Sequence, residues 1–404
     1  MKKKRGGQKK RRGMCLLLIL SMIVLALSGC SKKKETKTEK PPTKKIEVEK
    51  PEPVEEVPEE PEEEKIPENQ NLLTGLADLT DAAYVANRGG YTADGVTAGK
   101  DGSGYSTDYM YRDTTTASEG DLLDYILVSK LPHITSEATF LSEYTFQDTL
   151  SGGITYNKDV KIAFYDNAMD ANANNTKNAK VLWNLNSGDY TQHYVDVTVT
   201  NPDTGVQNAD GSTRLTVALT EDGLRAVNGV DAAGKQIESL SDYYMVVYYT
   251  ATLDADSSMV LGDEGNPNDV RLTWSRTSHG YSNTLEDRNY VYAYGLDLQK
   301  TFSPADTGQT LAGKVQFRLY NATDERYVMA EKSQKDGLYY VRQKTKNEAE
   351  ATLFTPAADG RLWICGLEGD SYELTEVATA DGYQLLKEPV TIAIRATDRE
   401  VIAA

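Results

Sequence analysis

The amino-acid sequence predicts an all-β protein, built as tandem β-sandwiches that follow a disordered N-terminal stalk. Apolar and polar residues alternate with period two from about residue 91 onward, which is typical of strands with one buried face. Clusters of Gly, Asn and Asp separate the alternating segments, as turns do. A Lys/Glu/Pro-rich tract precedes them and is too poor in apolar residues to form a core.

The N-terminus reads as a secretion signal. Basic residues crowd positions 2–12, and an apolar run follows from Met14 to Leu27. That run is too short to span a bilayer as a mature helix. Residues 27–30 read Leu-Ser-Gly-Cys, a lipobox, so we predict a lipoprotein signal peptide over 1–29 and lipidation of the Cys30 thiol. The alternative is a plain signal peptide or short anchor in which Cys30 is incidental.

Two short regions separate this signal from the alternating segments. Residues 30–70 form a Lys/Glu/Pro linker, which we expect to be disordered and extended as a spacer between membrane and cell wall. Residues 71–90 open with Asn-Leu-Leu-Thr-Gly-Leu. This opening resembles that of a family of Gram-positive lipoproteins that begin with an "LTGL" box, so we predict a short segment of its own there.

Composition restricts the possible partners and cross-links. The chain has 404 residues and a formal net charge of −17, which argues against nucleic acid as a partner. Of the three cysteines, one lies in the signal and one in the lipobox. Only Cys365 remains in the body, so we expect no intramolecular disulfide there.

The strands can be placed by their alternation. The clearest segments are 195–199, 215–219, 270–274, 290–294, 315–319 and 390–394. Turn clusters stand at 151–153, 208–211 and 264–268. Strands at this spacing, each with one apolar face, predict β-sandwiches. Residues 221–227 form the one helix that we expect, with little else helical.

The first half of the body carries a family resemblance. Residues 118–132 and 144–156, which include Tyr-Thr-Phe-Gln-Asp-Thr-Leu-Ser-Gly-Gly, resemble the opening of the D2-type domain of sortase-assembled pilin shaft proteins. Residues 247–253 and 265–272 resemble its end. The resemblance implies an immunoglobulin-like β-sandwich, which we place at 91–288.

The second half resembles a Cna B-type, prealbumin-like domain. The likeness rests on residues 294–300, 311–320 and 372–383, the last of which holds the E-box pattern Tyr-x-Leu-x-Glu. It implies a second β-sandwich over 289–404. Together the two resemblances indicate a SpaA-like, Gram-positive pilin shaft protein carried on a lipoprotein signal.

Domains of these families are often cross-linked internally by an isopeptide bond. A Lys amine attacks an Asn carboxamide while a buried Glu or Asp assists. Burial favours this chemistry, because it lowers the pKa of an amine and raises the pKa of a carboxyl. In the second domain the resemblance assigns the nucleophile to Lys300 and the assisting acid to Glu376. The alternatives are a solvated strand end and an ordinary strand-face carboxylate.

The sequence of the second domain does not supply the Asn acceptor that the resemblance implies. No Asn follows Asn347, although the family places its Asn on the last strand. Asp398 could substitute, the domain could be incomplete, or no bond could form. We favour an incomplete or bond-free domain over the Asp398 alternative.

The first domain carries an acid and an acceptor but lacks the expected lysine. Asp148 matches the assisting acid, and Asn268 is a plausible acceptor. Arg112 stands near the expected lysine position, but a guanidinium stays protonated and is not a nucleophile. Lys100 is a distant substitute. A bond here is therefore less expected, and Asp148 and Asn268 could be ordinary turn residues.

These observations favour a structural or adhesive role over catalysis. The chain shows neither an LPxTG-type tail nor a pilin lysine motif, so we expect it not to polymerise into a covalent pilus. The histidines His133, His193 and His279 are far apart in the sequence, without metal-ligand spacing. We therefore expect no enzyme activity, no metal and no cofactor.

The predicted function is that of a lipid-anchored surface protein on the extracellular face of the cell membrane. Its partners would be the membrane, through the N-terminal lipid, and a host or cell-surface protein or glycan, but not nucleic acid. Three alternatives stay open. They are a glycan- or solute-binding lipoprotein that uses its 25 tyrosines, a wall-acting enzyme, and a truncated or chimeric reading frame.

Overall fold

The computed structural model describes twelve stretches of the chain. These are residues 72–78, 91–92, 95–96, 111, 113–133, 140–172, 176–184, 194–201, 211–254, 259–277, 282–303 and 311–395. The signal peptide, Cys30, the linker 30–70, Lys100, Arg112 and Asp398 lie outside them. Within the described residues, none of the helices is long and apolar enough to cross a membrane.

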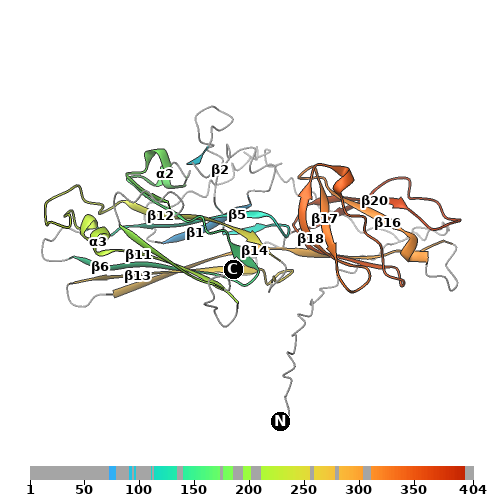
Figure 1. Ribbon diagram of the computed structural model, residues 1–404, viewed down its shortest axis with the longest axis horizontal. Helices are drawn as coiled ribbons and strands as arrows, with labels where there is room; N and C mark the ends of the chain where they lie inside the picture. Colours follow the sequence, from blue (N-terminus) through green and yellow to red (C-terminus); the bar gives the residue numbers. More distant parts are fainter. Residues whose placement is uncertain are drawn as a thin grey trace, which may run out of the picture. The chain divides into compact units, whose positions relative to one another are not determined.

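Two six-stranded sheets form the first domain, which we call the first sandwich (Figure 1). One sheet has the order β1 (Leu73–Asp78), β5 (Leu122–Lys130), β12 (Tyr244–Leu253), β8 (Lys161–Tyr165) and β9 (Val181–Asn184), with β7 (Ile154–Tyr156) also on β12. The other has the order β10 (Val195–Thr200), β11 (Thr213–Leu219), β6 (Leu141–Leu150), β13 (Asn266–Arg276), β14 (Ser282–Tyr292) and β4 (Thr114–Thr116). A two-stranded pair, β2 (Tyr91–Thr92) and β3 (Gly95–Val96), stands apart from both.

The core of the first sandwich lies between its two sheets. Inward side chains such as Tyr125 and Val247 from one sheet and Phe146 and Leu272 from the other share one buried apolar cluster. Each large apolar side chain buried in this way contributes roughly 1.5–3 kcal/mol. Strand β12 is buried on both faces, since a second cluster around Tyr248 covers its outer side. The short helix α2 (Ala168–Asn172) contributes to that cover.

The segment that opens with the "LTGL" box is hydrogen-bonded into this sandwich. Strand β1 runs antiparallel to β5, and Leu76 is fully buried in the core between the sheets. The Thr74 backbone N–H donates to Asp287 at 2.7 Å, and the Asn289 side chain donates to the Thr74 hydroxyl at 2.9 Å. Strand β1 therefore ties one sheet of the sandwich to strand β14 of the other.

One seven-stranded sheet forms the second domain. Its order is β15 (Tyr294–Gln299), β19 (Arg361–Leu367), β18 (Leu338–Thr345), β17 (Arg326–Lys332), β16 (Gln316–Asn321), β20 (Ser371–Ala378) and β21 (Val390–Ala393). Val315, Leu319, Val341 and Ile364 belong to its apolar core. Short 3₁₀ turns lie at Thr176–Asn178 in the first sandwich, and at Leu311–Lys314 and Glu348–Glu350 in this domain. The prediction of an all-β protein is confirmed.

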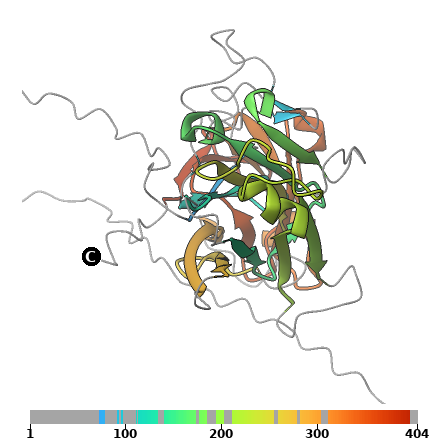
Figure 2. The ribbon, with the colours of Figure 1, turned by 90° about the vertical axis from the view of Figure 1, so that its left-hand side faces the viewer.

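The one predicted helix is also confirmed. Helix α3 (Glu221–Val227) covers the residues expected from the sequence and lies beside β6 and β11 (Figures 1 and 2). The Thr220 hydroxyl caps it by accepting a hydrogen bond from the Gly223 N–H at 3.1 Å. Glu221 and Asp222 complement the positive end of the helix dipole in the first turn.

Candidate isopeptide sites

Lys300 and Glu376 lie together in the second domain, although 75 residues separate them in the chain. Lys300 directly follows β15, where its backbone N–H donates to the Gly360 carbonyl at 2.8 Å. Glu376 lies in β20. The Lys300 Nζ is 2.7 Å from Glu376 Oε1, with the two side chains 14% and 0% exposed. The pair is therefore a nearly dry contact between an amine and a carboxyl.

Aromatic rings and one backbone amide complete the surroundings of this pair. The Lys300 Nζ lies 5.2 Å from the centroid of the Phe302 ring and 6.0 Å from that of Phe317. Phe302 in turn packs edge-on against Tyr383, with ring centroids 4.7 Å apart. The second oxygen of Glu376, Oε2, accepts a hydrogen bond from the Leu386 N–H at 2.9 Å. Both carboxyl oxygens are thus held in place, as an assisting acid requires.

The structure brings together two of the three residues proposed for the second domain. The third, Asp398, lies outside the described residues. The last strand that the structure describes, β21, ends at Ala393 and pairs with β20, the strand that carries Glu376. Strand β21 is therefore hydrogen-bonded to the strand that carries the proposed assisting acid.

The site proposed in the first sandwich has a different composition. Asp148 on β6 and Asn268 on β13 are buried, and both contact the hydroxyl of Tyr249 on β12. The Tyr249 hydroxyl donates to Asp148 Oδ2 at 2.5 Å, and Asn268 Nδ2 donates to the Tyr249 oxygen at 3.2 Å. Burial raises the pKa of Asp148 to about 7, against the opposing effect of these hydrogen bonds.

A tyrosine stands where an amine would be needed. Among the described residues, the side chains hydrogen-bonded to Asp148 are those of Tyr249 and Asn268. The Tyr249 ring stacks on Tyr125 with centroids 5.0 Å apart and meets Tyr156 edge-on at 5.8 Å. Burial raises the pKa of the Tyr249 phenol well above its usual value, so the hydroxyl stays a hydrogen-bond donor. The predicted acid and acceptor are adjacent, but they form a non-covalent network.

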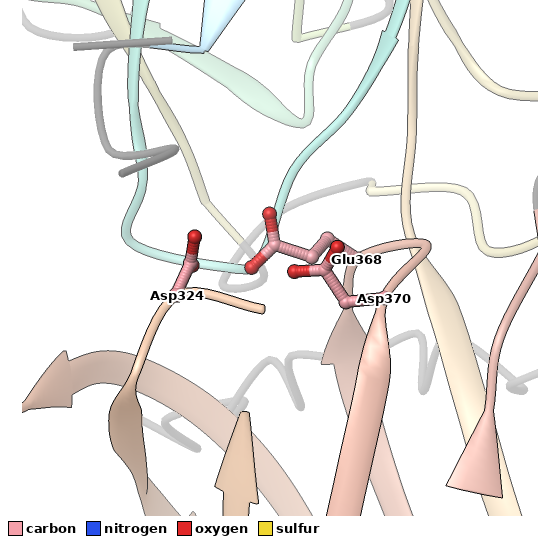
Figure 3. Close-up of side chains that lie close together, drawn as sticks. All are labelled: Asp324, Glu368 and Asp370. Atoms are coloured by element: carbon pink, nitrogen blue, oxygen red, sulfur yellow. The ribbon is translucent and has the colours of Figure 1, made fainter. Parts of the chain in front are cut away.

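A third polar cluster was not expected from the sequence. The carboxyl groups of Asp324, Glu368 and Asp370 converge in the second domain, with ligand atoms within 4.8 Å of one another (Figure 3). The Lys344 ammonium lies among them, bonded to Asp324 and Glu368. The chain thus supplies its own cation to this acidic cluster. Glu368 and Asp370 are close in the sequence, but Asp324 and Lys344 come from other parts of the chain.

One family model matches the chain. Residues 298–404 match the model of the SpaA prealbumin-like fold domain, and this range includes Lys300, Glu376 and Asp398. No curated protein matches the chain.

Solved structures of pilins resemble the chain with low identity. The T6 backbone pilin of serotype M6 Streptococcus pyogenes is 17% identical, with 69% of this chain and 48% of that chain covered and a TM-score of 0.44. This chain thus spans about half the length of that pilin. The group B streptococcus pilus 2b backbone protein is 18% identical, with 69% of this chain and 87% of that chain covered and a TM-score of 0.45. The major pilin SpaA of Corynebacterium diphtheriae is 18% identical, with 70% of this chain and 62% of that chain covered and a TM-score of 0.43.

The family match agrees with the fold of the second domain. The seven-stranded sheet, the E-box glutamate on β20 and the lysine after β15 lie within or at the edge of the matched range. The family match and the observed sheet thus agree with the prealbumin-like resemblance of this part of the sequence.

Proposed function

We propose that this protein is a structural or adhesive protein displayed on the extracellular face of the cell membrane, anchored by lipid at Cys30. In this proposal the second domain is stapled by an amide bond from Lys300. The observation that carries it is the 2.7 Å contact between the Lys300 amine and the buried Glu376 carboxyl, inside a SpaA-type domain.

The proposed bond follows from the chemistry of these groups. The unprotonated Lys300 Nζ attacks Cγ of the neutral, protonated Asp398 carboxyl, a new N–C bond forms, and the bond from Cγ to the hydroxyl oxygen breaks. Glu376 takes the proton from the amine and returns it to the leaving oxygen, so that one water is released. The amide would join the first strand of the domain to the segment beyond its last strand. A cross-link that closes so long a loop restricts the unfolded chain by roughly 4–5 kcal/mol.

The alternative of a glycan-binding protein gains less support. That function would need a concave surface with exposed tyrosines, on which sugar rings could stack. A cavity of about 600 Å³ lies on the sheet of β6, β11, β13 and β14, and its lining residues include Gln147, Arg214, Asp269 and Arg288. None of its lining residues is a tyrosine. We therefore favour the structural role.

Intact-mass measurement with peptide mapping of the full chain tests the staple. We expect the loss of one water, with Lys300 and Asp398 in one linked peptide. Lys300→Arg should restore the unshifted mass, because a guanidinium is not a nucleophile. Lys332→Arg is the matched control, since Lys332 is an exposed lysine of the same domain that pairs with Asp336. An unshifted mass for the parent chain would reject the staple.

The lipid anchor is tested separately. We expect the parent chain in the membrane fraction, with a diacylglycerol on the peptide that begins at Cys30. Cys30→Ser should abolish that modification and release the protein from the membrane. Recovery of the Cys30→Ser chain in the membrane fraction, at the level of the parent, would reject the lipid as the anchor.

A further inference from the structure

A short turn of the first sandwich contacts the second domain through its backbone. The turn Ser118–Asp121 directly precedes β5. Its Gly120 N–H donates to the Leu253 carbonyl of the first sandwich at 2.8 Å. Its Glu119 N–H donates to the Gly366 carbonyl of the second domain at 2.9 Å. The same turn is thus bonded to both domains.

Side chains of this turn reach further into the second domain. The Ser118 hydroxyl donates to Glu368 Oε1 at 2.9 Å, and the Lys344 Nζ lies 3.0 Å from Asp121 Oδ2. Arg342 pairs with Glu119. The side chains of Lys344 and Asp121 are only 1% and 2% exposed. Water is therefore largely excluded from the contact, and its ion pairs are less screened than surface pairs.

Two glycines permit the close approach of the chains. Gly120 has a φ of +87°, and a Cβ there would lie 2.0 Å from the Arg342 carbonyl oxygen across the contact. Gly366 has a φ of +89°, and a Cβ there would lie 2.9 Å from the Glu119 Cβ. Each glycine thus faces the other domain's chain at a distance that leaves no room for a side chain.

The carboxyl groups around Lys344 come from both domains. Lys344 is bonded to Asp324 and Glu368 of its own domain and to Asp121 of the first sandwich. Asn321 links the cluster to Asp370 by a hydrogen bond of 2.8 Å. Burial is the largest cause that raises the pKa of Glu368 to about 9, and the nearby Asp121 adds to it. Lys344 is therefore the cation that carboxyl groups of both domains share.

We propose that these residues form a clasp that fixes the first sandwich and the second domain to each other, with Lys344 as their shared cation. The clasp comprises Ser118, Glu119, Gly120, Asp121, Asp324, Arg342, Lys344, Gly366 and Glu368. A buried lysine is tolerated only when it is fully paired, and one of its partners comes from the other domain. Separation of the domains would leave that charge without Asp121. The clasp makes the two domains respond to load as one body, which is independent of the Lys300 staple.

Hydrogen exchange of the Glu119 amide in the full chain tests the clasp. This amide is bonded to Gly366 across the contact, so its exchange reports opening between the domains. In Lys344→Met we expect exchange at Glu119 to rise by at least about tenfold, the factor that 1.4 kcal/mol of lost coupling produces. Amides in the centres of β12 and β18 should stay protected. Lys332→Met, which removes an exposed lysine of the neighbouring strand, should leave Glu119 unchanged.

A second variant keeps the test decisive if Lys344→Met disturbs the second domain itself. Arg342→Met removes the pair with Glu119 at a position that is one-third exposed, where folding is less at risk. We expect a smaller rise in exchange at Glu119, with both cores protected. Parent-like exchange at Glu119 in Arg342→Met, and in any Lys344→Met preparation with protected cores, would overturn the clasp.

Discussion

The two domains hold a buried carboxyl in similar settings but place different partners beside it. Glu376 in the second domain contacts the amine of Lys300, whereas Asp148 in the first sandwich contacts the phenol of Tyr249. An amine can form an amide with a neighbouring carboxyl group, but a phenol held in this way serves as a hydrogen-bond donor. The partner of the acid, more than the acid itself, therefore decides whether a domain can be cross-linked.

The two domains also differ in the size of their apolar cores. The first sandwich buries one cluster between two six-stranded sheets and a second cluster on the outer face of β12. The described part of the second domain has one cluster, and its edge strand β21 leaves Val390 42% exposed. A small core gains more from a covalent constraint than a large one. A staple is therefore expected where the core is smaller.

Removal of the Glu376 carboxyl should have the largest effect on stability, because this acid pairs with an amine. Glu376→Ala leaves the mostly buried Lys300 without its partner, so we expect a loss of about 3–5 kcal/mol in the free energy of unfolding of the second domain. Any Lys300 cross-link should vanish as well. Denaturant unfolding and intact mass measure the two effects. Glu376→Gln is the control, because it keeps the packing and should abolish the bond at a smaller cost in stability.

The pH dependence of stability should single out the first sandwich. The Asp148 carboxyl has its ordinary pKa of 3.8 in the unfolded chain and a pKa of about 7 in the fold. Below pH 3.8 the group is protonated in both states. Between these values the unfolded chain loses its proton first, so the free energy of unfolding falls as pH rises, by up to about 4 kcal/mol at pH 8.

Urea unfolding of the full chain at pH 4, 6 and 8 measures this effect. Asp148→Asn keeps the size of the side chain but does not titrate, so the fall in stability of the first sandwich between pH 4 and 8 should shrink. The exposed pair Arg271–Glu286 of the same sheet offers a control, since Glu286→Gln should leave the slope unchanged. A slope that is identical in the parent and Asp148→Asn would contradict the raised pKa.

The features that could be predicted from the sequence are those whose signal lies within a few neighbouring residues of the chain. Period-two alternation identified strands such as β10 and β11, and the helix expected at residues 221–227 matches the observed bounds of α3. The E-box pattern of the family resemblance assigned Glu376, and its match at residues 294–300 assigned Lys300. Asp148 and Asn268 were paired in the same way. Each of these residues carries a signal within a few positions of itself in the chain.

The features that escaped prediction depend on distant residues. Tyr249 lies in an apolar run in which any tyrosine reads as core, and its hydroxyl reaches Asp148 only because the sheet of β12 packs against the sheet of β6. Lys344 lies in the polar stretch Gln343–Lys346, and its three acids come from positions 121, 324 and 368. The "LTGL" segment gave no sign of its partner, because an edge strand can pair with any exposed strand.

The smallest expected effect concerns the phenol that takes the place of an amine. Tyr249→Phe keeps the stack on Tyr125 but leaves Asp148 without its 2.5 Å donor. We expect the first sandwich to lose about 1–3 kcal/mol, because a buried acceptor goes unsatisfied. The loss should be larger at pH 8 than at pH 5, since the hydroxyl stabilises the ionised carboxyl more than the protonated one. Tyr290→Phe, a partly exposed tyrosine of the same domain, serves as the control. An equal loss at both pH values would mean that Tyr249 acts through packing alone, and the two domains would then differ in their cores and not in the chemistry beside their acids.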